Sequence, residues 1–319
     1  MTSSVRSSDI SLVLTTWNSR HCIGECLESL RRQTLPPTEI LLVDNGSEDG
    51  TADYIRLEYP SVRLIALPKN RGPAHARNIA IPQTLGDQIV ILDSDVRLHP
   101  HYLERLASQA HRPGIGMLGG RILSYDGSTL DSAGLILSRS YRFLDRAHGE
   151  PDTGQHSHFE WVFGVCSCAA WYSRECLEDL RSGEEYFDED FFYLVEDVDL
   201  AWRAQRRGWK VGYEPRAIAY HQRNGSRLKR RQRQYLSFRN RYLMLAKNGA
   251  LENKWEYLQR AGLYDATRLL YMLGTNTRLT LKALRELRRL SPRMQEKGRF
   301  SQNPLPPKAL ARTVPGGEL

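Results

Sequence analysis

The sequence lacks any apolar run that approaches the roughly 20 residues a membrane-spanning helix requires. Its first residues, MTSSVRSSD, are polar and contain no apolar signal region. The five cysteines are an odd number and their spacings form no zinc-ligand set, so buried, reduced thiols are the expected state. Together these absences predict a cytoplasmic protein.

Sequence patterns that mark several other classes of protein are also missing. There is no G-x-x-x-x-G-K-[ST] loop, which excludes the P-loop enzymes. We recognise no nucleic-acid-binding motif, and the aromatic residues are not interleaved with the most basic segment. The absence of a lysine-rich glycine loop near the N-terminus argues against a sugar nucleotidyltransferase.

Charge is distributed unevenly along the 319 residues, although the net charge is only +8. Residues 201–319 contain 27 Lys and Arg against 7 Asp and Glu, whereas residues 1–200 contain 18 against 30. A basic C-terminal third predicts an anionic partner, which could be a phosphate group, a lipid head group or a nucleic acid. A nucleic-acid-binding protein is therefore one alternative function.

Short apolar runs alternate with helical patterns over the first 95 residues. Apolar runs at 10–15, 40–43, 62–66 and 89–92 predict buried strands, and apolar residues recur at helical spacing in 20–33, 51–59 and from 74 onward. This alternation is typical of βαβ units, whose right-handed crossovers bring the carboxyl ends of parallel strands to one edge. The prediction is an α/β fold: a Rossmann-like, mostly parallel sheet flanked by helices, with a C-terminal helical extension.

The pattern changes after residue 95. Residues 117–124 and 134–138 predict strands that widen the sheet, 140–158 an irregular loop, 172–180 a short helix, and 209–220 one or two strands. We expect four regions in all. They are a disordered N-terminus at 1–9, a catalytic domain at 10–243, a helical region at 244–290 and a disordered tail at 291–319.

Two carboxylates one residue apart, Asp93 and Asp95, directly follow the buried run at 89–92. Alternate residues of an extended chain point the same way, so both can face one object. Two adjacent carboxylates repel unless a positive group lies between them, and a divalent cation carrying a diphosphate would supply it. The alternative is a surface turn after a strand, because Asp and Ser are ordinary turn residues.

Six short motifs follow one another along the chain. They are Leu14-Thr15-Thr16-Trp17-Asn18, Val43-Asp44-Asn45-Gly46-Ser47, Asn70-Arg71-Gly72-Pro73-Ala74-His75-Ala76-Arg77-Asn78, Asp93-Ser94-Asp95, Glu196-Asp197-Val198-Asp199-Leu200 and Tyr220-His221. Each motif is weak alone, but their order and spacing are specific. Together they resemble the family 2 glycosyltransferases of the GT-A fold, from about Ser11 to about Tyr242. Asp131-Ser132-Ala133-Gly134 favours the bacterial rhamnosyltransferase-type members.

The resemblance implies an inverting transfer from a nucleotide-diphosphate sugar, assisted by Mn²⁺ or Mg²⁺. Asp95 matches the family's metal ligand, and His221 matches a histidine that completes the metal site in many members. Asp93 would then face the ribose. The alternative for His221 is a strand-end histidine of the core.

The same resemblance assigns the remaining donor contacts. Thr15 and Asp44 would flank the nucleobase, although Asp44 could instead cap a turn before Gly46. Arg77 would reach the base or the diphosphate, unless it is a solvated helix arginine. Gly72 would let the backbone approach the ligand closely.

Inversion requires one base that deprotonates the acceptor hydroxyl. Asp197 matches the family's base, and Glu196 would hydrogen-bond the acceptor or orient the site. The alternative for both is a pair of acids that complement the dipole at a helix start.

By the same resemblance, the donor is dTDP-rhamnose, with UDP-galactofuranose or UDP-N-acetylglucosamine as alternatives. The acceptor is a hydroxyl of a cell-surface glycan or of a lipid-linked glycan. The basic, leucine-containing helices near the C-terminus fit contact with an anionic membrane at its inner face, and they fit equally a helical pair packed on the catalytic domain or a dimer contact.

Overall fold

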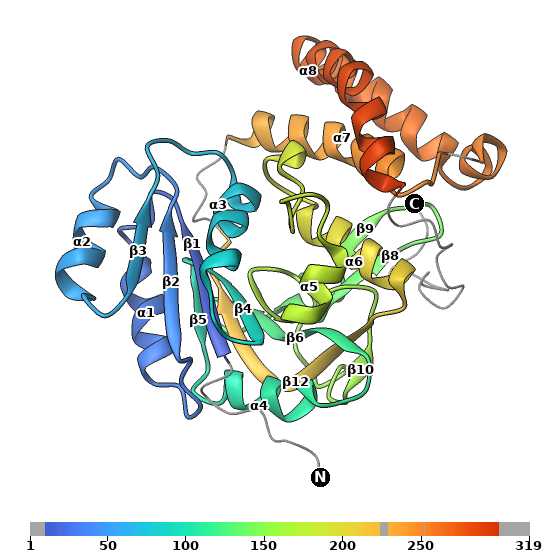
Figure 1. Ribbon diagram of the computed structural model, residues 1–319. Helices are drawn as coiled ribbons and strands as arrows, with labels where there is room; N and C mark the ends of the chain where they lie inside the picture. The colour runs from blue at the N-terminus through green and yellow to red at the C-terminus, as the bar shows by residue number, and fades with distance from the viewer. Residues whose placement is uncertain (1–9, 224–228, 252, 300–319) are drawn as a thin grey trace.

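The computed structural model describes residues 10–223, 229–251 and 253–299 (Figure 1). Its first half alternates strands with helices, as the sequence predicts. The four strands of this half pair in parallel with one another, in the order β3, β2, β1, β4. The elements are β1 (Ile10–Thr16), α1 (Ile23–Arg31), β2 (Glu39–Asp44), α2 (Thr51–Glu58), β3 (Arg63–Ala66), α3 (Pro73–Ala80) with a 3₁₀ turn η2 (Ile81–Gln83), and β4 (Gln88–Asp93).

The second half extends the same sheet beyond β4. The strand order is β10-β12-β6-β11-β4-β1-β2-β3, with β5 paired to β12 and β7 paired to β6. The β11 strand runs antiparallel to both of its neighbours, β4 and β6. These elements are β5 (Val96–Leu98), α4 (Tyr102–Ala110), β6 (Ile115–Ser124), β7 (Leu130–Ser132), β10 (Glu160–Trp161), β11 (Ala169–Ser173), α5 (Arg174–Leu180), the 3₁₀ turn η3 (Glu189–Phe191), α6 (Glu196–Arg207) and β12 (Lys210–His221).

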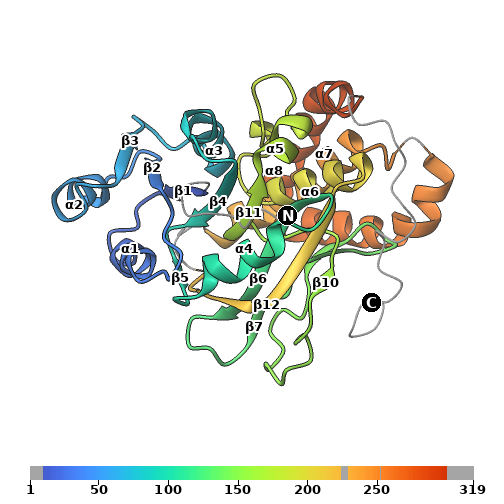
Figure 2. The ribbon, with the colours of Figure 1, turned by 60° about the horizontal axis from the view of Figure 1, so that its bottom comes forward.

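Helices cover both faces of the sheet, so the central strands are buried on both sides (Figure 2). Along β1, Leu12 and Leu14 pack in one apolar cluster with α1 and α4, whereas Val13 packs in another with α3, α5 and α6. The division follows from the two-residue period of a strand. The predicted α/β architecture with a mostly parallel, helix-flanked sheet is therefore confirmed.

Two further helices form the C-terminal region: α7 (Arg230–Lys247) and α8 (Lys254–Gly298). The backbone of α8 leaves helical geometry at Asn276, so it consists of two segments. Both pack on α7: Arg241 pairs with Asp265 of the first segment, and Arg239 pairs with Glu286 of the second. Among the described residues, no helix is both long and apolar enough to cross a bilayer.

Three sequence expectations differ from the structure. Residues 134–138 do not widen the main sheet, because β8 (Leu135–Leu137) pairs instead with β9 (Phe143–Asp145), inside the segment expected to be an irregular loop. Tyr172 belongs to β11. The helix expected from residue 172 begins at Arg174, because the Ser173 side chain accepts a hydrogen bond from the Cys176 N–H and caps it.

The third difference concerns the tail expected at 291–319. The α8 helix continues to Gly298, because Met294 is buried against α7 and Lys297 pairs with acidic residues of the catalytic domain. The remainder of the expected tail, 300–319, and the expected N-terminal segment 1–9 lie outside the described residues.

Candidate active site

A cleft of about 720 Å³ lies at the carboxyl ends of β1 and β4, between the starts of α3 and α6 and the end of β12. It brings together residues that are far apart in sequence, as the parallel strand order predicts. Eight of the nine predicted site residues line it: Thr15, Gly72, Arg77, Asp93, Asp95, Glu196, Asp197 and His221.

Arg77 links two of the predicted carboxylates. It is buried, and its guanidinium donates to Asp93 at 3.0 Å and to Glu196 at 3.2 Å. Thr15 donates a further hydrogen bond of 3.3 Å to the same oxygen of Asp93. Arg77 is therefore a buried bridge between Asp93 and Glu196 and not a solvated helix arginine, and its expected contact with the base or the diphosphate stays a prediction.

The protonation of Glu196 follows from its surroundings. Burial raises the pKa of Glu196 to about 7, although the Arg77 guanidinium beside it acts in the opposite direction. Its second carboxylate oxygen, Oε2, is buried and has no hydrogen-bond partner among the described residues. An unpartnered buried oxygen in a cleft can accept a hydrogen bond from a ligand hydroxyl, or donate one when protonated.

His221 and Asp95 form the second group of predicted residues. The Nε2 atom of His221 lies 3.4 Å from Asp95 Oδ1, and its Nδ1 atom lies 2.8 Å from Asp131 Oδ2. Burial lowers the pKa of His221, but the hydrogen bonds to Asp131 and Asp95 outweigh it and raise the pKa to about 10. Asp131 also pairs with Arg223.

This arrangement fits a divalent cation that is held jointly with a ligand. Metal-binding histidines commonly place their second ring nitrogen against a carboxylate, as His221 does with Asp131. Among the described residues there is no group of three or more side chains that could hold a metal alone. A cation that keeps substrate phosphates in its coordination shell needs only one or two protein carboxylates, so Asp95 and His221 are the residues that could contribute to such a shell.

Asp197 is the second residue of α6, directly after Glu196. One carboxylate oxygen accepts the Ser167 N–H at 3.2 Å, and the other accepts the Val198 N–H at 2.8 Å. Burial raises the pKa of Asp197 above its usual range, although these hydrogen bonds act against it. The carboxylate is thus oriented by the backbone and is more basic than a solvated aspartate.

The packing of the protein's own backbone requires a glycine at position 72. Its φ is +87°, and a Cβ atom there would overlap the carbonyl oxygen of Phe192. The expected close approach of backbone is therefore made by the segment that precedes α6. In this segment Phe192, Leu194 and Val195 all have positive φ, a strained conformation for residues other than glycine.

The segment before α6 is held in place from α7 and α8. Asn240 donates to the carbonyl oxygens of Phe191 and Tyr193 at 2.9 and 2.8 Å. Lys297 contacts Glu185, Asp188 and Asp190 at 2.8, 2.6 and 2.7 Å. We refer to residues 185–195 as the catalytic loop, because they lead directly into Glu196 and Asp197 at the start of α6.

Asp44 is the one predicted site residue that does not line the cleft. It is buried at the end of β2, and it accepts hydrogen bonds from the Ser47 hydroxyl and from the Ser47 N–H. These contacts describe a turn-capping aspartate. The turn-capping role and a contact with a nucleobase can both hold, so the expected base contact stays a prediction.

Sequence reasoning missed several residues that shape the cleft. Asp131 carried a signal, since it opens the Asp131-Ser132-Ala133-Gly134 motif, but its contact with His221 crosses 90 residues of chain. Ser167 contacts Asp197 through its backbone N–H, a group that every residue except proline has, so the residue type gives no signal. Asn240 is a polar residue at a fully buried position of α7, and its carbonyl partners could not be identified without the fold.

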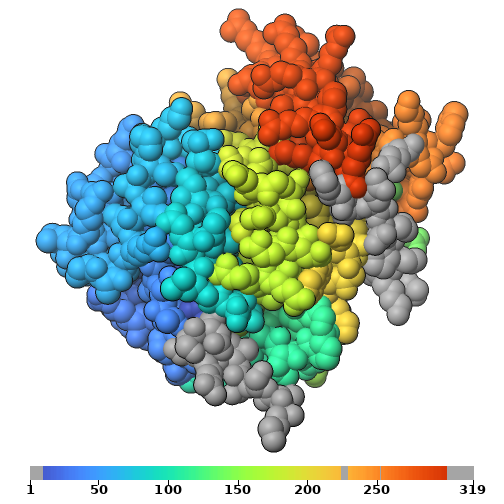
Figure 3. Space-filling view, in the orientation of Figure 1, coloured from blue at the N-terminus to red at the C-terminus, as the bar shows by residue number. Residues whose placement is uncertain are grey.

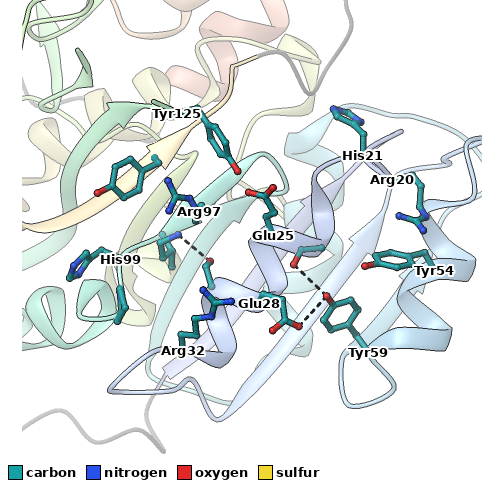
Figure 4. Close-up of a pocket in the computed structure, with 15 residues that line it drawn as sticks. Arg20, His21, Glu25, Glu28, Arg32, Tyr54, Tyr59, Arg97, His99 and Tyr125 are labelled. Carbon is teal, nitrogen blue, oxygen red and sulfur yellow. Dashed lines mark hydrogen bonds between the residues drawn. The ribbon is translucent and has the colours of Figure 1, made fainter. Parts of the chain in front are cut away.

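A second hollow, of about 800 Å³, lies beside α1 and contains none of the predicted site residues (Figure 4). Its most distinctive feature is Arg97, whose guanidinium lies 5.3 Å from the ring centre of Tyr125 and 4.3 Å from that of Tyr220. Tyr220 and His221 are adjacent in β12 and therefore point to opposite faces. The hollow is thus separated from the cleft by the β12 strand.

Comparison with known proteins points to one family. The model of glycosyl transferase family 2 matches residues 11–181. N-acetylglucosaminyl-diphospho-decaprenol L-rhamnosyltransferase of Mycobacterium tuberculosis is 31% identical over 230 residues, which cover 66% of this chain and 75% of that protein.

Two solved structures are similar in fold. The mannosyltransferase PcManGT from Pyrobaculum calidifontis, in complex with GDP-Man and Mn²⁺, has a TM-score of 0.53 and 18% identity, covering 93% of this chain and 85% of that one. S. aureus TarS 1-349 in complex with UDP has a TM-score of 0.52 and 18% identity, covering 91% and 88%. Both align over almost the whole chain, including the C-terminal helices.

Proposed function

Because the chain belongs to glycosyltransferase family 2, we propose that it transfers a sugar with inversion from a nucleotide-diphosphate donor to a hydroxyl of a cell-surface or lipid-linked glycan. Rhamnose from dTDP-rhamnose is the proposed donor, supported by the similarity to the mycobacterial rhamnosyltransferase. UDP-galactofuranose or UDP-N-acetylglucosamine is the alternative. The single observation that carries the proposal is the convergence of Asp95, His221 and Asp197 on one cleft.

Asp95 and His221 are the residues that would hold a divalent cation, Mn²⁺ or Mg²⁺. When bound, the cation stabilises the negative charge of the departing nucleoside diphosphate as a Lewis acid. Asp131 fixes the ring of His221 through Nδ1, so that Nε2 is directed toward Asp95. Asp93, which is held by Thr15 and Arg77, would accept a hydrogen bond from the donor's ribose.

Asp197 is the proposed base. In a single displacement, the acceptor oxygen forms a bond to the anomeric carbon while the bond from that carbon to the diphosphate oxygen breaks, and the acceptor proton passes to the Asp197 carboxylate. Its backbone hydrogen bonds from Ser167 and Val198 limit its rotation, and burial raises its pKa, so it is suited to take a proton from a hydroxyl. Glu196 would orient the acceptor through its unpartnered oxygen.

The proposed setting is cytoplasmic, with contact at the inner face of the membrane where a lipid-linked acceptor would be found. In the division of the chain that we propose, residues 10–243 form the catalytic domain and the helices beyond it an accessory region. The α7 helix crosses this boundary, and Tyr264 and Arg268 of α8 line the cleft together with Ser237 and Arg241 of α7, so the two regions share the site.

A donor-binding and turnover experiment tests the proposal. Thermal unfolding is followed with dTDP- and UDP-sugars in the presence of Mn²⁺, Mg²⁺ or a chelator; a ligand at 100 times its dissociation constant adds about 2.7 kcal/mol of stability. We expect one nucleotide sugar to raise the Tm only when metal is present. Asp95→Asn should remove this shift, whereas Asp53→Asn on the exposed surface of α2 should retain it.

Asp197→Asn tests the base separately from the donor site. Transfer should fall by about 100-fold to 10,000-fold, the usual contribution of a general base, while the metal-dependent donor shift stays. Unchanged turnover in Asp197→Asn would exclude it as the base. Salt-sensitive binding of DNA without any response to nucleotide sugars would instead favour the nucleic-acid alternative.

A further inference from the structure

The exposed apolar side chains of the protein are concentrated on one helix. Ten large apolar residues are exposed in the described part of the chain, and seven of them belong to α8. A surface helix ordinarily turns charged or polar residues toward water and keeps its apolar face for the core. The seven are Trp255, Leu258, Leu263, Leu270, Tyr271, Leu281 and Leu284.

The first segment of α8 has one side that is buried on α7 and another that is apolar and exposed. One side packs on α7 through buried Ala261, Asp265 and Met272. The other side carries Trp255, Leu263 and Leu270, with exposed fractions of 78%, 81% and 69%. Spacings of eight and seven residues place these three on one side of a helix. We call them the α8 stripe.

The charged residues exposed on α8 are almost all basic. Eight of its Lys and Arg residues are exposed against a single exposed acid, Glu296. Most of the eight belong to the second segment, which projects from the body of the molecule (Figure 3). We call these residues the basic set; they are Lys254, Arg260, Arg278, Lys282, Arg285, Arg288, Arg289 and Arg293.

We propose that the α8 stripe and the basic set together form a docking surface for an anionic lipid bilayer. An apolar stripe beside Lys and Arg is the composition that lies in the plane of a membrane, with aromatic and leucine side chains among the acyl chains and cations at the head groups. No helix in the described residues can span the bilayer, so the contact is interfacial. A second copy of the chain fits less well, because it would bring two basic sets together.

The position of α8 gives this docking a role in catalysis, and this step rests on the proposed function. Tyr264 and Arg268, in the same segment as the stripe, line the cleft, as does Arg241 of α7. Docking through α8 therefore places one wall of the cleft next to the head groups. An acceptor anchored by a lipid chain would enter along this wall, where Arg268 offers a cation to an acidic head group or a lipid-borne phosphate.

Vesicle co-sedimentation of the full chain tests the docking without any donor or acceptor. We expect binding to vesicles that contain phosphatidylglycerol, weaker binding to pure phosphatidylcholine, and loss of affinity as salt rises. The double variant Leu263→Glu/Leu270→Glu should lower the vesicle partition coefficient by about tenfold or more, because two leucines leave the acyl region and two charges face it.

A matched control is available on the same protein. Leu57 and Leu85 are 77% and 89% exposed and lie outside α8, so Leu57→Glu/Leu85→Glu adds the same charge and should bind vesicles like the wild type. A second variant, Arg288→Glu/Arg289→Glu, should lose binding mainly to the phosphatidylglycerol vesicles. Circular dichroism and the metal-dependent donor shift confirm that each variant is folded.

Three results would overturn the inference. The first is that the wild type does not bind anionic vesicles. The second is that Leu263→Glu/Leu270→Glu and its control lose vesicle binding equally. The third is that light scattering shows a stable dimer of the wild type, which Leu263→Glu/Leu270→Glu dissociates and the control does not. The last would assign the stripe to self-association. If vesicles bind but no nucleotide sugar does, the proposed function fails and the docking stands; if a sugar is transferred to a soluble acceptor but vesicles do not bind, only the docking fails.

Discussion

Single residues show which features of the site a local sequence motif can predict and which it cannot. Asp95 and Asp197 could be identified as candidate site residues from their local sequence. Asp95 lies just after the end of β4 and Asp197 lies in the first turn of α6, so local sequence determines the position of each carboxylate. Arg77 was expected to face the ligand because the motif places it on α3, but its partner Glu196 lies 119 residues away. A cross-chain ion pair of this kind has no local signature, so the sequence could not show that Arg77 bridges two carboxylates.

Gly72 provides the first test at this level. In Gly72→Ala the new methyl group would overlap the Phe192 carbonyl, and φ +87° with ψ 157° is a conformation reserved for glycine. We expect a loss of about 2 kcal/mol or more in the free energy of unfolding, together with a loss of transfer, since the displaced segment leads into Glu196. Urea unfolding and turnover measure the two effects.

Gly50 is the control for Gly72. Its φ is +83°, but a Cβ atom there meets nothing within 4 Å, so Gly50→Ala adds backbone strain alone, on the order of 1 kcal/mol. Equal losses in the two variants, with full activity retained in both, would show that the contact between Gly72 and Phe192 is unimportant.

The titration of Glu196 predicts a pH dependence of stability. The pKa of Glu196 is raised to about 7 by burial, so the folded state holds a proton that the unfolded chain releases nearer its usual value of 4.5. The stabilising contribution is complete below that lower value and is lost as pH rises through about 7. The unfolding free energy of the wild type should therefore fall between pH 5 and pH 8, relative to Glu196→Gln.

Denaturant unfolding at several pH values measures this difference. The exposed Glu184 offers a control, because Glu184→Gln should follow the wild type at every pH. Wild-type and Glu196→Gln curves that stay parallel from pH 5 to pH 8 would show that Glu196 keeps an ordinary pKa in the folded protein.

Elements as a whole were predicted with uneven success. The strands β1, β2 and β4 and the helices between them follow from short apolar runs and helical spacing, because strands buried on both faces carry continuous apolar residues. The three-residue strands β5 and β9 were missed, since they are too short for periodicity to distinguish them from loops. The strand at 134–138 was predicted, but β8 pairs with β9 and not with the main sheet. The role of α7 in supporting the catalytic loop depends on buried Asn240 and Lys247, which are polar and weaken the apolar pattern.

Lys247 tests the support that α7 gives to the loop. It is buried and contacts Asp188 at 2.7 Å and Asp199 at 2.8 Å. Although burial acts to raise it, Lys247 and Lys297 hold the pKa of Asp188 well below its usual range. Lys247→Met removes one cation from between two buried carboxylates, and we expect a loss of roughly 3 kcal/mol in the free energy of unfolding.

Lys282 on the exposed face of α8 is the matched control for Lys247. Its ammonium group lies 3.9 Å from Glu286, and Lys282→Met should change the unfolding free energy by less than about 0.5 kcal/mol. If the two methionine variants unfold at the same urea concentration, the buried ion cluster does not stabilise the loop.

The molecule as a whole combines a predictable core with a less predictable accessory region. The sheet order up to β4 follows from right-handed βαβ connections, but the antiparallel β11 between β4 and β6 could not be inferred from residue patterns. Likewise, helical spacing predicts the C-terminal helices but not that α8 turns at Asn276 and packs both segments on α7. The charge asymmetry found in the sequence lies largely in these helices.

Removal of α8 tests whether the accessory region is part of one cooperative structure. A chain that ends at residue 250 loses the cover over Tyr235, Leu236 and Phe238 of α7 and the partners of Arg239 and Arg241. We expect aggregation or non-cooperative unfolding and no transfer. A monomeric shortened chain that unfolds with the Tm of the full protein would show that the two regions are independent.

The contacts of Lys297 have a consequence for how the enzyme is made. Its three carboxylate partners in the catalytic loop precede it by 107 to 112 residues. A ribosome therefore completes the sheet and the acids of the active site long before it adds the last turn of α8. We therefore expect the nascent chain to carry an incompletely supported loop and to acquire transfer activity only near the end of synthesis.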